Sequence, residues 1–341
     1  MPASASAAAP PAPRVAAATG AVFLALISWS IPGVLVRGMT MPALPMVTYR
    51  LLIGVVLGVG VLYAGRGRLT WRVLRASTVA GLCLGVDLVA FFLALKLTTV
   101  ANATVIGSLQ PLLLLFAAPM LFGERIRWPD ALAALTAIAG VSLVFLGSTG
   151  QASWNPRGDL WAVVTLLAWT GYFLACKRAR RELGSRELTA GSSMVAVLVV
   201  LPALAWNPSG FAVPTPLQWA GLATMAGVGW SGHVLMNWAL GHIPVWVGGT
   251  ASLAAPIATT ALAALVLDEA LTAQQVTGMV IAMIALTAVT LRTRKVLADD
   301  AAPVVLEPPV DEHPLAEPAA SAHEATGREV VEHEVTGRAG G

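Results

Sequence analysis

Charged residues are scarce in this 341-residue sequence: they make up 11% of the chain, whereas hydrophobic residues make up 57%. A soluble domain has about 25% charged residues, because its exterior must be hydrated. A chain with so little charge suits a hydrocarbon solvent instead of water. The composition therefore predicts an integral membrane protein, whose first partner is the lipid bilayer.

Cysteine is almost absent as well. The two cysteines, Cys83 and Cys176, fall inside apolar segments and do not have the spacing of a disulfide framework or a metal site. We expect two buried thiols with no redox role. The sequence predicts no metal and no cofactor.

Signatures of enzymes and of nucleic-acid binding are also missing. The sequence has no His-Glu-x-x-His, no Gly-x-Ser-x-Gly and no Gly-x-x-x-x-Gly-Lys, so it lacks the common metalloprotease, hydrolase and ATP-binding motifs. No basic run is interleaved with aromatic residues, which excludes a typical nucleic-acid surface. We predict that the protein is not an enzyme and binds no nucleic acid.

Ten long apolar segments are present instead. Each is close to the ~20 residues that cross about 30 Å of hydrocarbon, and their apolar residues do not alternate, which favours helices over barrel strands. The sequence therefore predicts an all-α membrane protein with ten transmembrane helices. The predicted spans are 15–36, 45–64, 77–97, 101–122, 129–146, 160–176, 189–206, 217–236, 245–267 and 273–291.

Lysine and arginine are distributed unevenly between these segments. With the N-terminus inside, fifteen of them fall in cytoplasmic segments and three, Arg37, Lys96 and Arg157, fall outside. The positive-inside rule then places both termini in the cytoplasm, and the expected location is the cell (inner) membrane. Residues 1–14 and the acidic residues 298–341 have too few apolar side chains to form a core, so we expect a disordered leader and a disordered tail.

The two halves of the chain are alike. A shift of 145 residues places Ala94-Leu95 on Ala239-Leu240, Pro111 on Pro256 and Glu124 on Glu269, and a shift of 140 places Trp29 on Trp169. An odd number of helices in each half makes the second copy insert upside down. The sequence therefore predicts two inverted five-helix repeats, at 15–147 and 158–292, which is typical of secondary transporters.

Short motifs recur in both copies. The first copy has Trp29-Ser-Ile-Pro, Tyr49-Arg50-Leu-Leu, and Ala94-Leu95-Lys96 continuing through Pro111 to Gly123-Glu124-Arg125; the second has Trp169, Ala239-Leu240, Pro256 and Asp268-Glu269. In order and spacing, these motifs resemble the EamA family of the drug/metabolite transporter superfamily over about residues 15–292. The copies differ where Asp268 replaces Gly123 and where Gly241-His242 stand in place of Lys96. The resemblance implies a central cavity between the halves and transport of amino acids, metabolites or drugs.

A secondary transporter is therefore the expected function. We expect it to move a small polar molecule, such as an amino acid, an amino-acid derivative or a drug-like compound, by alternating access, and we favour an exporter. A proton is the candidate coupling ion. The alternatives are a membrane sensor or scaffold, which would normally have a folded soluble domain, and a membrane enzyme with an unrecognised site, which would need a catalytic cluster.

Three ionisable side chains within the predicted spans are candidates for the site. Asp87 lies in the middle of span 77–97, where a charge costs about 2.5–3.5 kcal/mol on insertion scales and needs a reason. It either binds a cationic substrate group or a coupling proton, or pairs permanently with Arg50. Arg50 either binds a substrate carboxylate or extends to the outer headgroups. His233 is close to the equivalent of Asp87 in the second half, and it either relays a proton or bonds to a neighbouring helix.

Uncharged polar and aromatic residues complete the set. Five aromatic residues either line a cavity or pack between helices: Trp29, Tyr49, Trp169, Tyr172 and Trp230. Asn102 and Gln110 share a face of one predicted helix, where they bind either a ligand or another helix. Glu124 and Glu269 end two spans, and we expect each to cap the short turn before the next helix.

Overall fold

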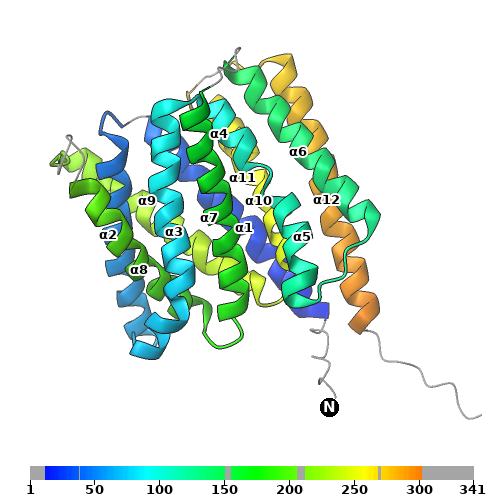
Figure 1. Cartoon of the computed structure of the whole chain (residues 1–341), viewed down its shortest axis with the longest axis horizontal. Coiled ribbons are helices and arrows are strands. Elements are labelled where there is room, and N and C mark those ends of the chain that lie inside the picture. The colour runs from blue at the N-terminus through cyan, green and yellow to red at the C-terminus, as the bar shows by residue number, and fades with distance from the viewer. Residues whose placement is uncertain (1–11, 38, 150–154, 206–211, 268–269, 302–341) are drawn as a thin grey trace, which may run out of the picture. The chain divides into compact units, whose positions relative to one another are not determined.

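The computed structural model describes residues 12–37, 39–149, 155–205, 212–267 and 270–301 (Figure 1). Within these ranges every regular element is a helix, and no strand is present. The helices are α1 (Ala12–Arg37), α2 (Ala43–Ala64), α3 (Trp71–Leu97), α4 (Val100–Gly107), α5 (Gln110–Phe122), α6 (Trp128–Thr149), α7 (Pro156–Ala179), α8 (Ser185–Ala205), α9 (Pro216–Leu240), α10 (Val245–Ser252), α11 (Ala254–Leu267) and α12 (Ala273–Ala301).

The predicted all-α membrane fold is confirmed. Among the described helices, nine spans are long and apolar enough to cross a bilayer. The tenth crossing is α9, which has 25 residues but is less apolar because it contains polar residues such as Gln218, His233 and Asn237. With α4 and α5 counted as one span, and α10 and α11 as another, the two inverted repeats contain five crossings each.

Two predicted spans, 101–122 and 245–267, are broken into two helices each, so the prediction of continuous helices was wrong there. α4 ends at Gly107 and α5 begins at Gln110, while α10 ends at Ser252 and α11 begins at Ala254. Pro111 and Pro256 lie in the first turn of the second helix in each pair; proline has no N–H to donate to the preceding turn. Ser108 and Ser252, at the two breaks, each donate a side-chain hydrogen bond to a carbonyl three residues earlier.

Most helices are longer than their predicted spans. Thr70 caps α3 by accepting a hydrogen bond from the Val73 N–H at 3.3 Å, so this helix begins well before residue 77. Capping residues are polar and lie outside the apolar run, so a span predicted from hydropathy is shorter than the helix. α1 begins inside the predicted leader 1–14, and α12 continues past residue 298. The other residues of the leader and the tail lie outside the described ranges, as do Asp268 and Glu269.

The repeats are interlocked. α3 packs against α7 and α8, α6 packs against α12, and α1 packs against α9 and α11, whereas helices of the same repeat contact each other less. The α6–α12 contact brings two backbones together at Gly140. A Cβ atom at this position would lie 2.6 Å from the backbone nitrogen of Ala282 and 2.7 Å from the carbonyl oxygen of Gly278. Small residues allow this close approach, as is common between membrane helices.

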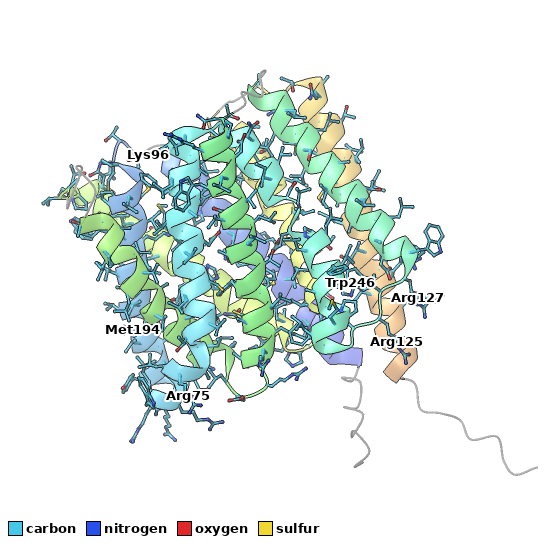
Figure 2. All side chains as sticks on the ribbon, in the orientation of Figure 1. Arg75, Lys96, Arg125, Arg127, Met194 and Trp246 are labelled. Atoms are coloured by element: carbon cyan, nitrogen blue, oxygen red, sulfur yellow. The ribbon has the colours of Figure 1, made fainter. Side chains whose placement is uncertain are left out.

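Basic side chains gather at one end of the helix bundle, which we call the basic end. Figure 2 shows Arg75, Arg125 and Arg127 at this end and Lys96 at the opposite end. The described start of α1 and the end of α12 also lie at the basic end (Figure 1). The bundle therefore begins and finishes on the same side, as an even number of crossings requires.

Candidate functional site

A cavity of about 300 Å³ lies between the first three helices of one repeat and the first three helices of the other. α1, α2 and α3 form one part of its wall, and α7, α8 and α9 form the rest. The residues that line it are Trp29, Pro32, Arg50, Leu51, Gly54, Leu84, Asp87, Leu88, Trp169, Ser193, Met225, Ala226, Gly229, Trp230 and His233. The cavity thus contains the three ionisable residues that the sequence singled out.

Arg50 and Asp87 bring opposite charges to this cavity. Within the described part of the chain, neither side chain makes a hydrogen bond or an ion pair shorter than 4.0 Å. Each group nevertheless acts electrostatically on the other across the cavity, without a direct contact.

Aromatic rings form a further part of the cavity wall. The ring centroids of Trp29 and Trp169 lie 5.8 Å apart in an edge-to-face arrangement, and Trp29 lies 5.2 Å from the ring of His233. Tyr172 stacks on Trp169 at 5.2 Å. Such offset and edge contacts are favourable for aromatic pairs and hold the rings in fixed positions. The cavity therefore combines two opposite charges with a rigid aromatic surface.

A chain of hydrogen bonds behind this wall leads to His233. The Thr189 hydroxyl donates to the Ser185 carbonyl at 2.8 Å, so the Thr189 oxygen accepts from the Asn237 amide at 2.9 Å. The same amide nitrogen lies 3.4 Å from the Tyr172 hydroxyl oxygen, which in turn lies 3.1 Å from His233 Nδ1. When this hydroxyl donates to Nδ1, a neutral imidazole has its proton on Nε2.

This network lies along α7 between the cavity and the basic end. Tyr172, Thr189 and Asn237 are almost fully buried, with 1%, 1% and 0% of their surface exposed. Along α7, Tyr172 lies between Trp169 at the cavity and Lys177, which pairs with Glu124 next to Arg125. Buried, hydrogen-bonded side chains therefore surround this part of α7.

Four sequence candidates do not line the cavity: Tyr172, which lies behind its wall, and also Tyr49, Asn102 and Gln110. Tyr49 makes an edge contact with Trp219 at 5.3 Å. Asn102 bonds to Thr98 and Asp159 near the start of α7. Gln110 donates to the carbonyl of Trp169 at 3.5 Å and accepts from Ser252 at 3.2 Å, so it links the two helix breaks. Asn102 and Gln110 lie on different helices, and the shared face predicted for them was wrong.

Several cavity residues escaped the sequence analysis, among them Ser193 and Met225. Ser193 lies 143 residues after Arg50, close to the shift that relates the two halves, so the repeat could have indicated it. Met225 has no such signal, because an apolar residue on an apolar helix looks the same whether it faces lipid, protein or a cavity.

Glu124 does not cap the turn that the sequence assigned to it. Its two carboxylate oxygens accept from the Val245 N–H, at 2.9 and 3.0 Å, at the start of α10 in the other repeat. The Lys177 ammonium lies 3.7 Å from Oε1 of Glu124. Burial raises the pKa of Glu124 above its ordinary value of 4.5, although Lys177 and the Val245 N–H act in the opposite direction. Asp130 takes the local role instead, by accepting from the Arg127 N–H.

Comparison with known proteins gives one family. A model of the EamA-like transporter family matches residues 17–146 and 156–291, which together make up most of the chain. The aromatic amino acid exporter YddG of Ancylobacter novellus is 30% identical over 178 residues. That alignment covers 50% of this chain and 60% of the relative's length.

A solved structure gives the same architecture. One crystal structure superposes with a TM-score of 0.70 at 26% identity, over 82% of this chain and 99% of the other. The family match occurs in two copies, which correspond to the two interlocked sets of helices. The chain therefore belongs to the EamA-like transporter family and is a multi-pass membrane protein.

Proposed function

We propose that the protein is a secondary transporter that exports a small zwitterion with an aromatic side chain, such as an aromatic amino acid. The observation that supports this most directly is that two opposite charges, Arg50 and Asp87, line one cavity beside an aromatic wall without touching each other. The name of the relative, an aromatic amino acid exporter, agrees with this chemistry. A cavity of about 300 Å³ is at the small end of the range for ligand sites, as such a substrate requires.

Each part of the proposed substrate has a partner in the cavity. The planar guanidinium of Arg50 suits a carboxylate, which it binds through two parallel hydrogen bonds. Asp87 suits an ammonium group, and it is also the candidate for the coupling proton. The rings of Trp29, Trp169 and Trp230 offer a flat apolar surface to an aromatic side chain. His233 adds an imidazole whose orientation is maintained by its hydrogen bond with Tyr172.

Alternating access is the proposed mechanism. Both repeats contribute three helices to the cavity, so a movement of one set against the other would open it to either side in turn. In this mechanism the Tyr172 network and the Glu124–Lys177 contact are the candidates for a gate toward the basic end. We place the basic end in the cytoplasm, together with both termini, because positive residues favour that side.

Accessibility labelling tests this orientation. In a Cys83→Ala/Cys176→Ala background, a cysteine at position 96 should react with a membrane-impermeant maleimide in intact cells. A cysteine at position 127 should react only after the membrane is permeabilised. Lys96 and Arg127 lie at opposite ends of the bundle, so the reverse pattern would contradict the proposed orientation.

Charge-deleted analogues test the substrate class. The assay measures transport of labelled phenylalanine into proteoliposomes in the presence of unlabelled competitors. Unlabelled phenylalanine should inhibit it more strongly than phenethylamine, which has no carboxylate, or 3-phenylpropionate, which has no ammonium group. Arg50→Gln should reduce the advantage of phenylalanine over phenethylamine, and Asp87→Asn its advantage over 3-phenylpropionate. Each loss should be on the order of ten- to a hundredfold, as expected for a hydrogen bond to a charged group.

A control and a double variant complete this test. Tyr49→Phe changes a residue that does not line the cavity, and it should leave the order of the three compounds unchanged. If the Arg50→Gln/Asp87→Asn double variant transports at the original rate, the two charges serve each other and the proposed substrate contacts are refuted. Transport is normalised to the amount of protein in the membrane.

A further inference from the structure

A second hollow, which we call the α3–α7 groove, lies at the basic end and shares no residue with the central cavity. It lies between the first turns of α3 and the last turns of α7, and its volume is about 820 Å³. Arg72, Arg75 and Arg178 line it, together with Trp71 and Glu182. Figure 2 shows Arg75 at this end of the bundle.

The three arginines of the groove have no partner among the described residues. Within the described residues, none of their side chains makes a hydrogen bond or an ion pair, and the same holds for Glu182. Other basic residues nearby are occupied: Lys177 pairs with Glu124, and Arg180 donates to the carbonyls of Asn237 and Leu183. Three guanidinium groups and one carboxylate give the groove a net charge of +2 that nothing in the described chain neutralises.

The same groove continues into an apolar surface. Trp71 has 78% of its surface exposed, and an exposed tryptophan beside basic residues is typical of the membrane–water interface. Farther along α3, Val79 at 63% and Leu82 at 46% are also exposed. A molecule that fits this arrangement has a negative headgroup at the arginines and a hydrocarbon chain along α3.

We propose that the α3–α7 groove is a binding site for an anionic phospholipid. The phosphodiester accepts hydrogen bonds from Arg72, Arg75 and Arg178, which present planar donors suited to phosphate oxygens. An acyl chain lies against Val79 and Leu82. The lipid contacts the two helices that bring Asp87 and Trp169 to the central cavity, and it does so without entering that cavity.

Lipid binding to the purified protein tests this proposal. Native mass spectrometry would compare phosphatidylglycerol with phosphatidylcholine on the unmodified protein and on Arg72→Gln/Arg75→Gln/Arg178→Gln. The matched control is Arg68→Gln/Arg125→Gln/Arg127→Gln, which removes the same charge from loops outside the groove. The unmodified protein should prefer phosphatidylglycerol at least tenfold. The groove variant should lose this preference, because each basic residue that contacts the lipid contributes on the order of fivefold to its affinity. The control should keep the preference within about twofold, because its three arginines lie outside the groove.

Two results would overturn the proposal. Equal losses in the groove variant and the control would mean that only the overall charge attracts the lipid. Competition by inorganic phosphate at the same concentration as phosphatidylglycerol would mean that the groove binds free phosphate instead of a lipid.

A second measurement does not depend on the arginine variants. Phosphatidylglycerol with brominated acyl chains should quench tryptophan fluorescence more in the unmodified protein than in Trp71→Phe, and brominated phosphatidylcholine should show no such difference. Equal quenching of both proteins by brominated phosphatidylglycerol would also refute the site.

Discussion

The contact between Glu124 and Lys177 joins three parts of the chain: the α5–α6 loop, the end of α7 and the start of α10. The two side chains are 10% and 19% exposed, so the pair is largely buried. Removing one partner of a buried pair costs about 3–5 kcal/mol, because the other charge is left without compensation. Lys177 keeps its hydrogen bond to the Ile243 carbonyl, at 2.6 Å, which puts the expected cost at the lower end of this range.

We therefore expect Glu124→Ala to lower the free energy of unfolding by about 3 kcal/mol, since it also leaves the Val245 N–H without an acceptor. Glu124→Gln keeps an acceptor for this N–H, and it should cost only about 1 kcal/mol, because burial already disfavours the charged form of Glu124. Lys177→Met leaves the carboxylate without its ammonium partner and should cost about 2 kcal/mol. The double variant Glu124→Gln/Lys177→Met should also cost about 2 kcal/mol, because it leaves no buried charge behind.

Equilibrium unfolding by SDS in mixed micelles would measure these values. The control is Glu187→Gln: Glu187 also accepts from a backbone N–H, that of Gly184, but has no lysine partner, and its loss should cost less than about 1 kcal/mol. If the costs of the two single variants simply add in the double variant, Glu124 and Lys177 are not coupled and the reasoning is refuted.

Three further predictions concern pH, packing and the tail. Burial raises the pKa of Glu124, so its carboxyl group binds a proton more readily in the folded protein than in the unfolded chain. This contribution to stability is complete below about pH 4.5, and it is lost as the pH rises through the pKa of the folded state. In unfolding curves measured at several pH values, Glu124→Gln should remove this pH dependence. Gly140→Val should destabilise the protein by more than about 2 kcal/mol in the SDS assay, whereas Gly60→Ala, which has open space for its Cβ, should be neutral or slightly stabilising. Removal of residues 303–341, which are rich in acidic residues and proline, should leave transport per molecule unchanged, and a loss would indicate a regulatory tail.

The membrane-crossing segments were predictable because the bilayer imposes a simple requirement on composition. Each helix needs about 20 apolar residues, and that signal survives without any knowledge of packing. The breaks in the fourth and ninth spans escaped the hydropathy pattern, since each interrupts the helix by only one or two residues within a span that is apolar as a whole. Pro111 and Pro256 were the available evidence, and they were used as landmarks of the repeat instead of as helix breakers.

The residues around the cavity were partly predictable from their expected depth in the membrane. Counting residues along each span put Asp87 and His233 at similar levels, and the structure places both on one cavity. The partners that act across the chain could not be predicted in this way. Tyr172 reaches His233 and Asn237 over more than sixty positions, and Glu124 reaches Val245 over 121, so nothing in the local pattern of either segment indicates the contact.

The interlocking of the two repeats has a consequence for how the protein is made. When the first five crossings have left the ribosome, α1, α3 and α6 are in the bilayer while their main packing partners, α9, α7 and α12, have not yet been synthesised. Surfaces such as the one around Gly140 then face lipid or an insertion chaperone until α12, the last helix, arrives. A chain that stops after α6 would keep these surfaces exposed and would be a substrate for membrane proteases. The two halves expressed as separate polypeptides, by contrast, have complementary surfaces through which they can assemble.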